Sequence, residues 1–126
     1  MIVIEELEWC VIEKITLTAE RRDNRIELYF DNANVLTISD EGQLCCETRY
    51  ITCDDNLSEF VGAKFIGYEV ANGVSYEDAV CGLCHDEQFL RIHTDRGILV
   101  CANHNEHNGY YSGFSVVHTV SKYERN

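Results

Sequence analysis

The chain has 126 residues, of which 45% are hydrophobic and 25% are charged, so its length and composition suit one domain around a single core. Its formal net charge of −12 repels nucleic acid and anionic membrane surfaces, and no apolar run approaches the roughly 18 residues of a membrane span. We therefore expect neither nucleic acid nor a membrane as a partner. The seven cysteines, and an apolar start without a basic flank, favour a reduced protein that is not exported.

Alternating apolar and polar residues predict a series of short strands separated by turn-forming residues. They cover residues 10–17, 25–30, 35–38, 45–53, 65–70, 88–94, 98–103 and 114–120. An Asx cap at Asn56 and a stop at Gly62 predict one short helix near residues 55–61. Residues 72–86 are expected to form a looser insertion. The fold class is therefore mainly β: a single antiparallel domain, partly barrel- or sandwich-like, with one short helix.

The stretch Asn103–Phe114 holds most of the side chains that suit ligand binding. Asn108-Gly109 predicts a type I′ hairpin, which would place the polar residues in a loop at the end of a sheet. We expect Tyr110 or Tyr111 to stack on a flat ligand ring, while Glu47, Asn105 and Asn108 hydrogen-bond to its edges. The alternative is that the loop is polar only because it is exposed and that one tyrosine packs in the core.

Cys81-Gly82-Leu83-Cys84 is a Cys-x-x-Cys pair that His104 and His107 could complete as a tetrahedral zinc site. The gap between the two histidines is shorter than in zinc fingers, and no second pair of this kind follows. We therefore expect no cofactor and keep zinc as an alternative. With His85 the pair also fits haem attachment, which requires export, while a redox role would require a βαβ pattern that is missing.

The run His104-Asn105-Glu106-His107 contains groups that could perform acid-base chemistry or bind the metal ion of a nuclease. A nuclease must approach a polyanion, however, and the only cation within eight residues before this run is Arg96. The sequence therefore favours a protein without catalytic activity.

Four blocks resemble an uncharacterised family of small proteins from tailed phages and prophages. They are Cys45-Cys46-Glu47, Leu57 with Val61-Gly62, Phe89–Thr94, and Asn108-Gly109-Tyr110-Tyr111-Ser112. The resemblance spans about residues 43 to 117 and does not include the Cys81–His85 segment. It implies a phage accessory protein in the host cytoplasm, a class that includes inhibitors of host defence and proteins that sequester nucleotide signals.

The sequence and the resemblance together favour a non-enzymatic binding protein that sequesters a small nucleotide-derived host-defence signal. Its expected ligand-binding residues are Cys46, Glu47, Asn105, Asn108, Tyr110 and Tyr111. A phosphate on the ligand would require Arg49, Arg91 or Arg96 close by. One alternative is an acidic inhibitor of a host defence protein that imitates DNA, and another is a small zinc-binding or hydrolytic domain. The partner is thus a small molecule or a host protein, and the sequence leaves a homo-oligomer open.

Overall fold

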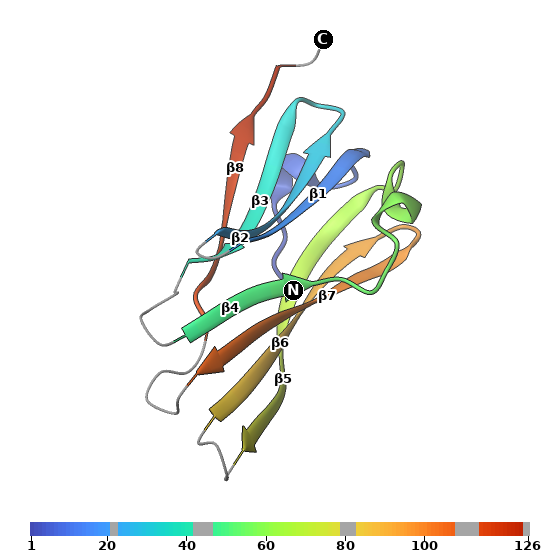
Figure 1. Cartoon of the computed structure of the whole chain (residues 1–126). Coiled ribbons are helices and arrows are strands. Elements are labelled where there is room, and N and C mark those ends of the chain that lie inside the picture. Colours follow the sequence, from blue (N-terminus) through green and yellow to red (C-terminus); the bar gives the residue numbers. More distant parts are fainter. Residues whose placement is uncertain (21–22, 42–46, 79–82, 108–113, 125–126) are drawn as a thin grey trace.

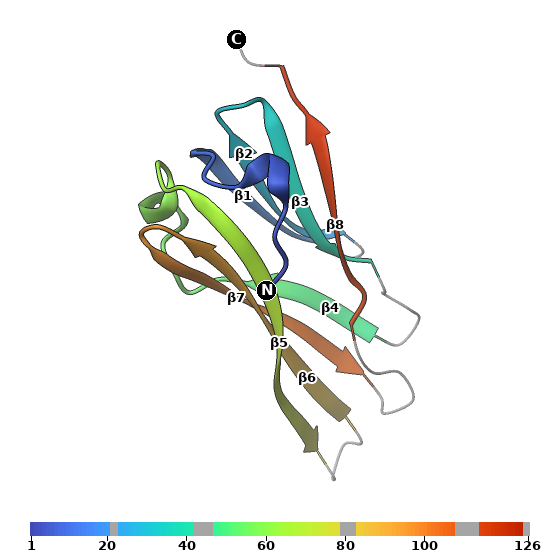
Figure 2. The ribbon, with the colours of Figure 1, turned by 180° about the vertical axis from the view of Figure 1, so that it is seen from behind.

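The computed structural model describes residues 1–20, 23–41, 47–78, 83–107 and 114–124, which form two antiparallel four-stranded sheets (Figures 1 and 2). The first sheet has the order β1-β2-β3-β8 and the second the order β4-β7-β6-β5. The strands are β1 (Ile12–Glu20), β2 (Asp23–Phe30), β3 (Asn34–Asp40), β4 (Glu47–Thr52), β5 (Phe65–Asp78), β6 (Leu83–Thr94), β7 (Gly97–His107) and β8 (Val116–Lys122). The predicted mainly β, antiparallel, sandwich-like fold is confirmed, and no closed barrel is formed by these strands.

The core lies between the two sheets because alternate residues of the strands are apolar and point inward. On β2 the inward row contains Ile26, Leu28 and Phe30, all fully buried. The Phe30 ring meets the Phe65 ring of β5 edge-on, with centroids 5.5 Å apart, and this contact joins the two sheets. Burial of each such side chain contributes about 1.5–3 kcal/mol to stability.

The predicted short helix is present as a 3-10 turn, η2 (Leu57–Phe60). The Asn56 side chain accepts a hydrogen bond from the Ser58 amide, as expected of a cap, and Gly62 follows with φ +94°. A second 3-10 turn that the sequence did not reveal, η1 (Glu5–Leu7), buries Leu7 completely in the core. Among the described residues, no helix has the length and apolar character needed to cross a membrane.

The expectation of a loose insertion at residues 72–86 is wrong, because β5 and β6 pair along almost their whole lengths in a long hairpin. The segment has no clear apolar alternation from which its strands could be predicted. Its strands are held by main-chain hydrogen bonds to neighbouring strands, which do not require that alternation. The register shifts between Asn72 and Ser75, and Gly73 lies in this irregularity. A Cβ atom at Gly73 would lie 2.7 Å from the carbonyl oxygen of Glu87 on β6.

Gly73→Ala is therefore expected to lower the free energy of unfolding by about 1–3 kcal/mol, since the methyl group would collide with backbone that cannot move alone. Urea unfolding monitored by circular dichroism measures the change. Gly97→Ala is not a clean control because Gly97 has φ +129°. Ala71→Ser, on the same strand, is the better one. Equal stability of the Gly73 variant and the wild type would contradict this expectation, and would show that β5 and β6 can move apart at the register shift.

The interpretation of Asn103–Phe114 as a hairpin loop is also wrong in its pairing. β7 continues through His107 and pairs with β4 and β6, whereas β8 pairs with β3 in the other sheet. The chain therefore passes from one sheet to the other between these strands. The Asn108-Gly109 turn itself lies outside the described residues.

Candidate functional site at the polar end of the sandwich

The inward-facing rows of several strands change from apolar to polar at the same end of the sandwich. On β7 the buried residues run from Leu99 and Cys101 to Asn103, Asn105 and His107. The corresponding rows of the neighbouring strands end at Asn24 on β2, Asp40 on β3, Glu47 and Arg49 on β4, and Asp86 on β6. One end of the interior is therefore a conventional core, and the other is a cluster of charged and amide side chains.

Arg49 is the centre of this cluster. Its Nη1 atom lies 2.8 Å from Asp40 Oδ1 on β3, and its Nη2 atom lies 3.0 Å from Glu47 Oε2 on β4. The arginine side chain is 4% exposed and both carboxylates are 0% exposed. Charges this deeply buried lose their hydration, which costs free energy. The Coulomb attraction between them offsets this cost only when the geometry is good and additional hydrogen bonds are made.

Amide groups supply those additional hydrogen bonds. Asn105 Nδ2 donates to Glu47 Oε2 over 2.6 Å, and Asn103 Nδ2 donates to Asp40 Oδ2 over 3.0 Å. The backbone amide of Ser115 donates to Asp40 Oδ1 over 2.9 Å. We refer to Asp40, Glu47, Arg49, Asn103 and Asn105 as the buried polar cluster. It joins β3 of the first sheet to β4 and β7 of the second.

A groove of about 350 Å³ opens beside the buried polar cluster. Its two buried lining residues both contact Arg49, because Asn24 Nδ2 donates to the Arg49 carbonyl over 2.6 Å and Asp40 binds the guanidinium. The lining residues are Asp23, Asn24, Arg25, Thr37, Ser39, Asp40, Glu41 and Thr119. A separate cavity lies between the sheets near Asn103 and Val116, but at about 10 Å³ it has room for no more than a single water molecule. Of these two spaces, the groove is the one whose volume suits a small ligand.

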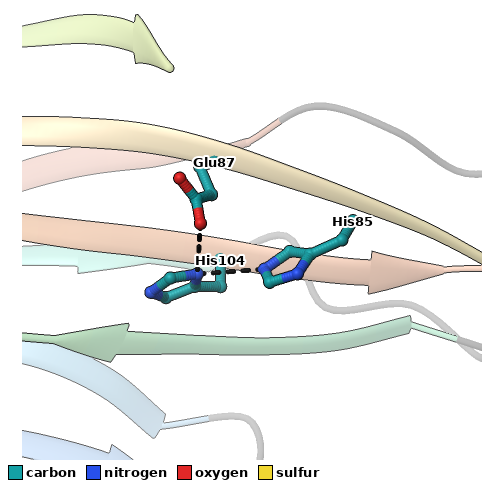
Figure 3. A group of neighbouring side chains, drawn as sticks. All are labelled: His85, Glu87 and His104. Carbon is teal, nitrogen blue, oxygen red and sulfur yellow. Dashed lines mark hydrogen bonds and ion pairs between the residues drawn. The ribbon is translucent and has the colours of Figure 1, made fainter. Parts of the chain in front are cut away.

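The outer face of the second sheet carries a second group of side chains (Figure 3). His104 on β7 stacks on Tyr50 of β4, with ring centroids 4.6 Å apart and planes 14° from parallel. On its other side His104 approaches His85 and Glu87 of β6. Burial is the main cause that lowers the pKa of His104, and the neighbouring His85 lowers it further. Burial and the carboxylate of Glu106 raise the pKa of Tyr50.

The structure brings together two of the residues that the sequence proposed as ligand-binding. Glu47 and Asn105 belong to the neighbouring strands β4 and β7 and are hydrogen-bonded to each other. The Glu47 side chain is 0% exposed, so its carboxylate binds within the cluster. Cys46, Asn108, Tyr110 and Tyr111 lie outside the described residues. Cys46 directly precedes Glu47 and Asn108 directly follows His107, and Glu47 pairs with His107 in the sheet.

The zinc ligands that the sequence suggested do not form one set. His104 points to the outer face of β7, whereas His107 points inward and lies 2.8 Å from Asp86, measured from Nε2 to Oδ2. Residues three apart on a strand project to opposite faces, so one ion cannot contact both imidazoles. Cys84 pairs with His107 across β6 and β7, and Cys81 lies outside the described residues.

A comparison with protein families adds one finding. A family model described as a domain of unknown function, DUF7448, matches residues 5–117. The chain belongs to the DUF7448 family. The match begins well before residues 43–117, where the sequence blocks indicated an uncharacterised family, and it includes β1 to β7 and the start of β8. No curated protein and no solved structure matched this DUF7448 chain.

Sequence reasoning missed Asp40 and the central position of Arg49, which was considered only as a phosphate ligand. It also missed the pairing of His85 and Glu87 with His104. The buried polar cluster could have been found from the alternation of β4, because Glu47 and Arg49 continue the inward row of Ile51 at two-residue steps. The outer group depends on the register between β6 and β7, which the expected loose insertion concealed.

Proposed function

We propose that this DUF7448 protein is a non-enzymatic binding protein of the phage accessory type, whose groove takes a small molecule rich in hydrogen-bond donors. The observation that supports this proposal most strongly is the buried polar cluster beside a groove of about 350 Å³. Burying an arginine and two carboxylates stabilises a fold less than apolar packing would. Departures of this kind from ordinary core composition are expected at functional sites.

The charges around the groove indicate the chemistry of the ligand. Asp23 and Glu41 supply accessible carboxylates, whereas the carboxylate of Asp40 is fully buried. Among the described lining residues the cation is Arg25, which already contacts Asp23 and lies 3.0 Å from Glu27. Carboxylates accept hydrogen bonds from the amino groups of nucleobases. A nucleoside, or the base portion of a nucleotide-derived host-defence signal, is the ligand class that fits this lining best.

The three arginines that the sequence suggested for phosphate binding are engaged by other groups, which supports a ligand without phosphate at the groove. Arg49 is bound by Asp40 and Glu47, and Arg91 lies 3.6 Å from Glu69. Arg96 donates to the carbonyl oxygen of Val61. With these cations engaged, a phosphate in the groove would face the carboxylates, so nucleosides are expected to bind more tightly than their phosphorylated forms.

The test is a thermal-shift panel of adenosine, guanosine and cytidine with their 5′-monophosphates, cyclic nucleotides and ADP-ribose. At 100 times its dissociation constant a ligand stabilises the folded state by about 2.7 kcal/mol, which raises the melting temperature by several degrees. We expect the largest shift from a nucleoside and recovery of that nucleoside unchanged by chromatography. Conversion to another compound would contradict a binding role without catalysis.

Glu41→Gln removes one exposed carboxylate of the groove and is expected to abolish the shift while leaving the melting temperature of the free protein unchanged. Glu59→Gln, an exposed carboxylate on η2, is the matched control and should respond like the wild type. No shift with any compound of the panel, or equal shifts in the two variants, would refute ligand binding at the groove.

A further inference from the structure

We propose that His85, Glu87 and His104 form a binding site for a divalent transition-metal ion, with Zn²⁺ as the best fit. The three residues lie on the face of the second sheet that points away from the buried polar cluster. His104 pairs directly with Glu87 across β7 and β6, and His85 is two residues from Glu87 on the same strand. Two-residue spacing on a strand places both side chains on one face, so all three converge at one point of the sheet.

The separations of the donor atoms match those around a tetrahedral ion. His85 Nε2 lies 3.0 Å from His104 Nδ1, and Glu87 Oε1 lies 3.6 Å from the same nitrogen. All three donor atoms are within 4.8 Å of one another. Zn–N and Zn–O bonds of about 2.0–2.2 Å at tetrahedral angles require donor separations of about 3.3 Å. The two separations from His104 Nδ1 are within a few tenths of an ångström of this value, and the third, between His85 and Glu87, has to shorten by at most about 1.5 Å for the three atoms to enclose an ion.

The orientation of His104 is set by groups that would not themselves contact the ion. Its Nε2 atom lies 2.8 Å from Thr52 Oγ1 on β4, and its ring stacks on Tyr50. When Nε2–H donates to the threonine hydroxyl, the Nδ1 lone pair points toward His85 and Glu87. Metal-binding histidines characteristically donate their second ring N–H in this way, which fixes both the tautomer and the ring plane. Burial favours the neutral ring, which is the form that binds metal.

The donor types select among the common ions. Two imidazoles and one carboxylate suit Zn²⁺, Cu²⁺ and Ni²⁺, whereas Mg²⁺ and Ca²⁺ prefer oxygen donors throughout. Three protein ligands leave a fourth position for an exchangeable water molecule or for an atom of a partner. This site differs from the Cys-x-x-Cys arrangement considered from the sequence, because it contains no sulfur ligand and does not use His107.

The same face of the second sheet offers a matched control on β6 and β5. His93 and Glu69 also form an imidazole-carboxylate contact on this face, 3.1 Å from Nε2 to Oε1, and their neighbour is the cation of Arg91 rather than a second histidine. An ion would be repelled there by the guanidinium. Zn²⁺ should therefore distinguish His104 from His93, although both histidines contact glutamate.

Isothermal titration of the 126-residue chain with Zn²⁺ tests the proposal. We expect one site per chain in the wild type and in His93→Ala, and no binding at that site in His104→Ala, His104→Gln or His85→Ala. Thr52→Val keeps all three donors and is expected to weaken binding by about tenfold, because it removes only the group that orients His104. Circular dichroism shows whether each variant is folded. If His104→Ala does not fold, His104→Gln tests the same loss of the imidazole in a folded protein.

Co²⁺ substitution distinguishes this site from binding to the cysteines. Tetrahedral nitrogen and oxygen ligands give visible d–d bands without the intense near-ultraviolet absorption of a cobalt-thiolate bond. Thiolate absorption, binding that persists in His104→Gln, or failure of the wild type to bind Zn²⁺, Ni²⁺, Cu²⁺ and Co²⁺ would each overturn the proposal. These results are independent of the nucleoside panel, since the groove is lined by the first sheet and the metal site lies on the second.

Discussion

Arg49→Ala is expected to lower the free energy of unfolding by about 3–5 kcal/mol, because Asp40 and Glu47 would remain buried without the cation that binds them both. The loss is a large part of the 5–15 kcal/mol that stabilises a typical domain. The variant should therefore unfold at much lower urea concentration or fail to accumulate as folded protein. Equilibrium unfolding at pH 7, followed by circular dichroism, measures the effect.

Arg91→Ala provides the control for this experiment. Arg91 also contacts a glutamate, but its side chain is 42% exposed and its partner Glu69 is 35% exposed. Solvent screening makes such surface pairs contribute little, so this variant should unfold almost like the wild type. Similar effects of the two substitutions would mean that Arg49 is not held in a dry environment, contrary to its position between the sheets.

The combined replacement Asp40→Asn, Glu47→Gln and Arg49→Met is expected to recover most of the stability that Arg49→Ala loses. It removes every charge of the buried polar cluster together, keeps amide oxygens that can accept from Asn103 and Asn105, and fills the space of the arginine stem. Neutral replacements of buried ion networks are often as stable as the original or more stable by about 1–4 kcal/mol. Urea unfolding compares the three proteins directly.

The same triple variant should no longer respond to nucleosides in the thermal-shift panel, since Asp40 is a lining residue of the groove and its buried carboxylate is held in place by Arg49. Recovered stability with lost binding would indicate that the charges serve recognition. If the triple variant were as unstable as Arg49→Ala, the cluster would instead be required for folding, and its value as support for a binding site would disappear.

The strands with a clear apolar alternation could be predicted from the sequence, and the strand segments without one could not. β2, for example, was found because Ile26, Leu28 and Phe30 alternate with the polar residues Glu27 and Tyr29. The segments 72–78 and 103–107 carry no comparable apolar row and were interpreted as loops. Their conformation depends on hydrogen bonds to neighbouring strands, which are long-range in sequence and leave no local pattern.

The candidate site shows the same division. Glu47 and Asn105 were selected for their side-chain chemistry, and their neighbouring strands bring them together. Asp40 could not be connected with them, because it lies on β3 of the first sheet and meets them only across the interface between the sheets. That arrangement follows from the pairing of β8 with β3 rather than with β7, which the sequence did not reveal. The outer group was equally hidden, since a single-residue shift in the register of β6 would move His85 and Glu87 to the other face.

The most direct test of the groove as a ligand site is a titration of ¹⁵N-labelled protein with guanosine, followed by amide chemical shifts. Guanosine presents two adjacent N–H donors that a carboxylate can bind together. The proposed function predicts the largest saturable shifts at residues 23–25, 37, 39–41 and 119, which line the groove. Saturable shifts confined to η2 and the opposite end of the sandwich, or no saturable shifts at all, would contradict it.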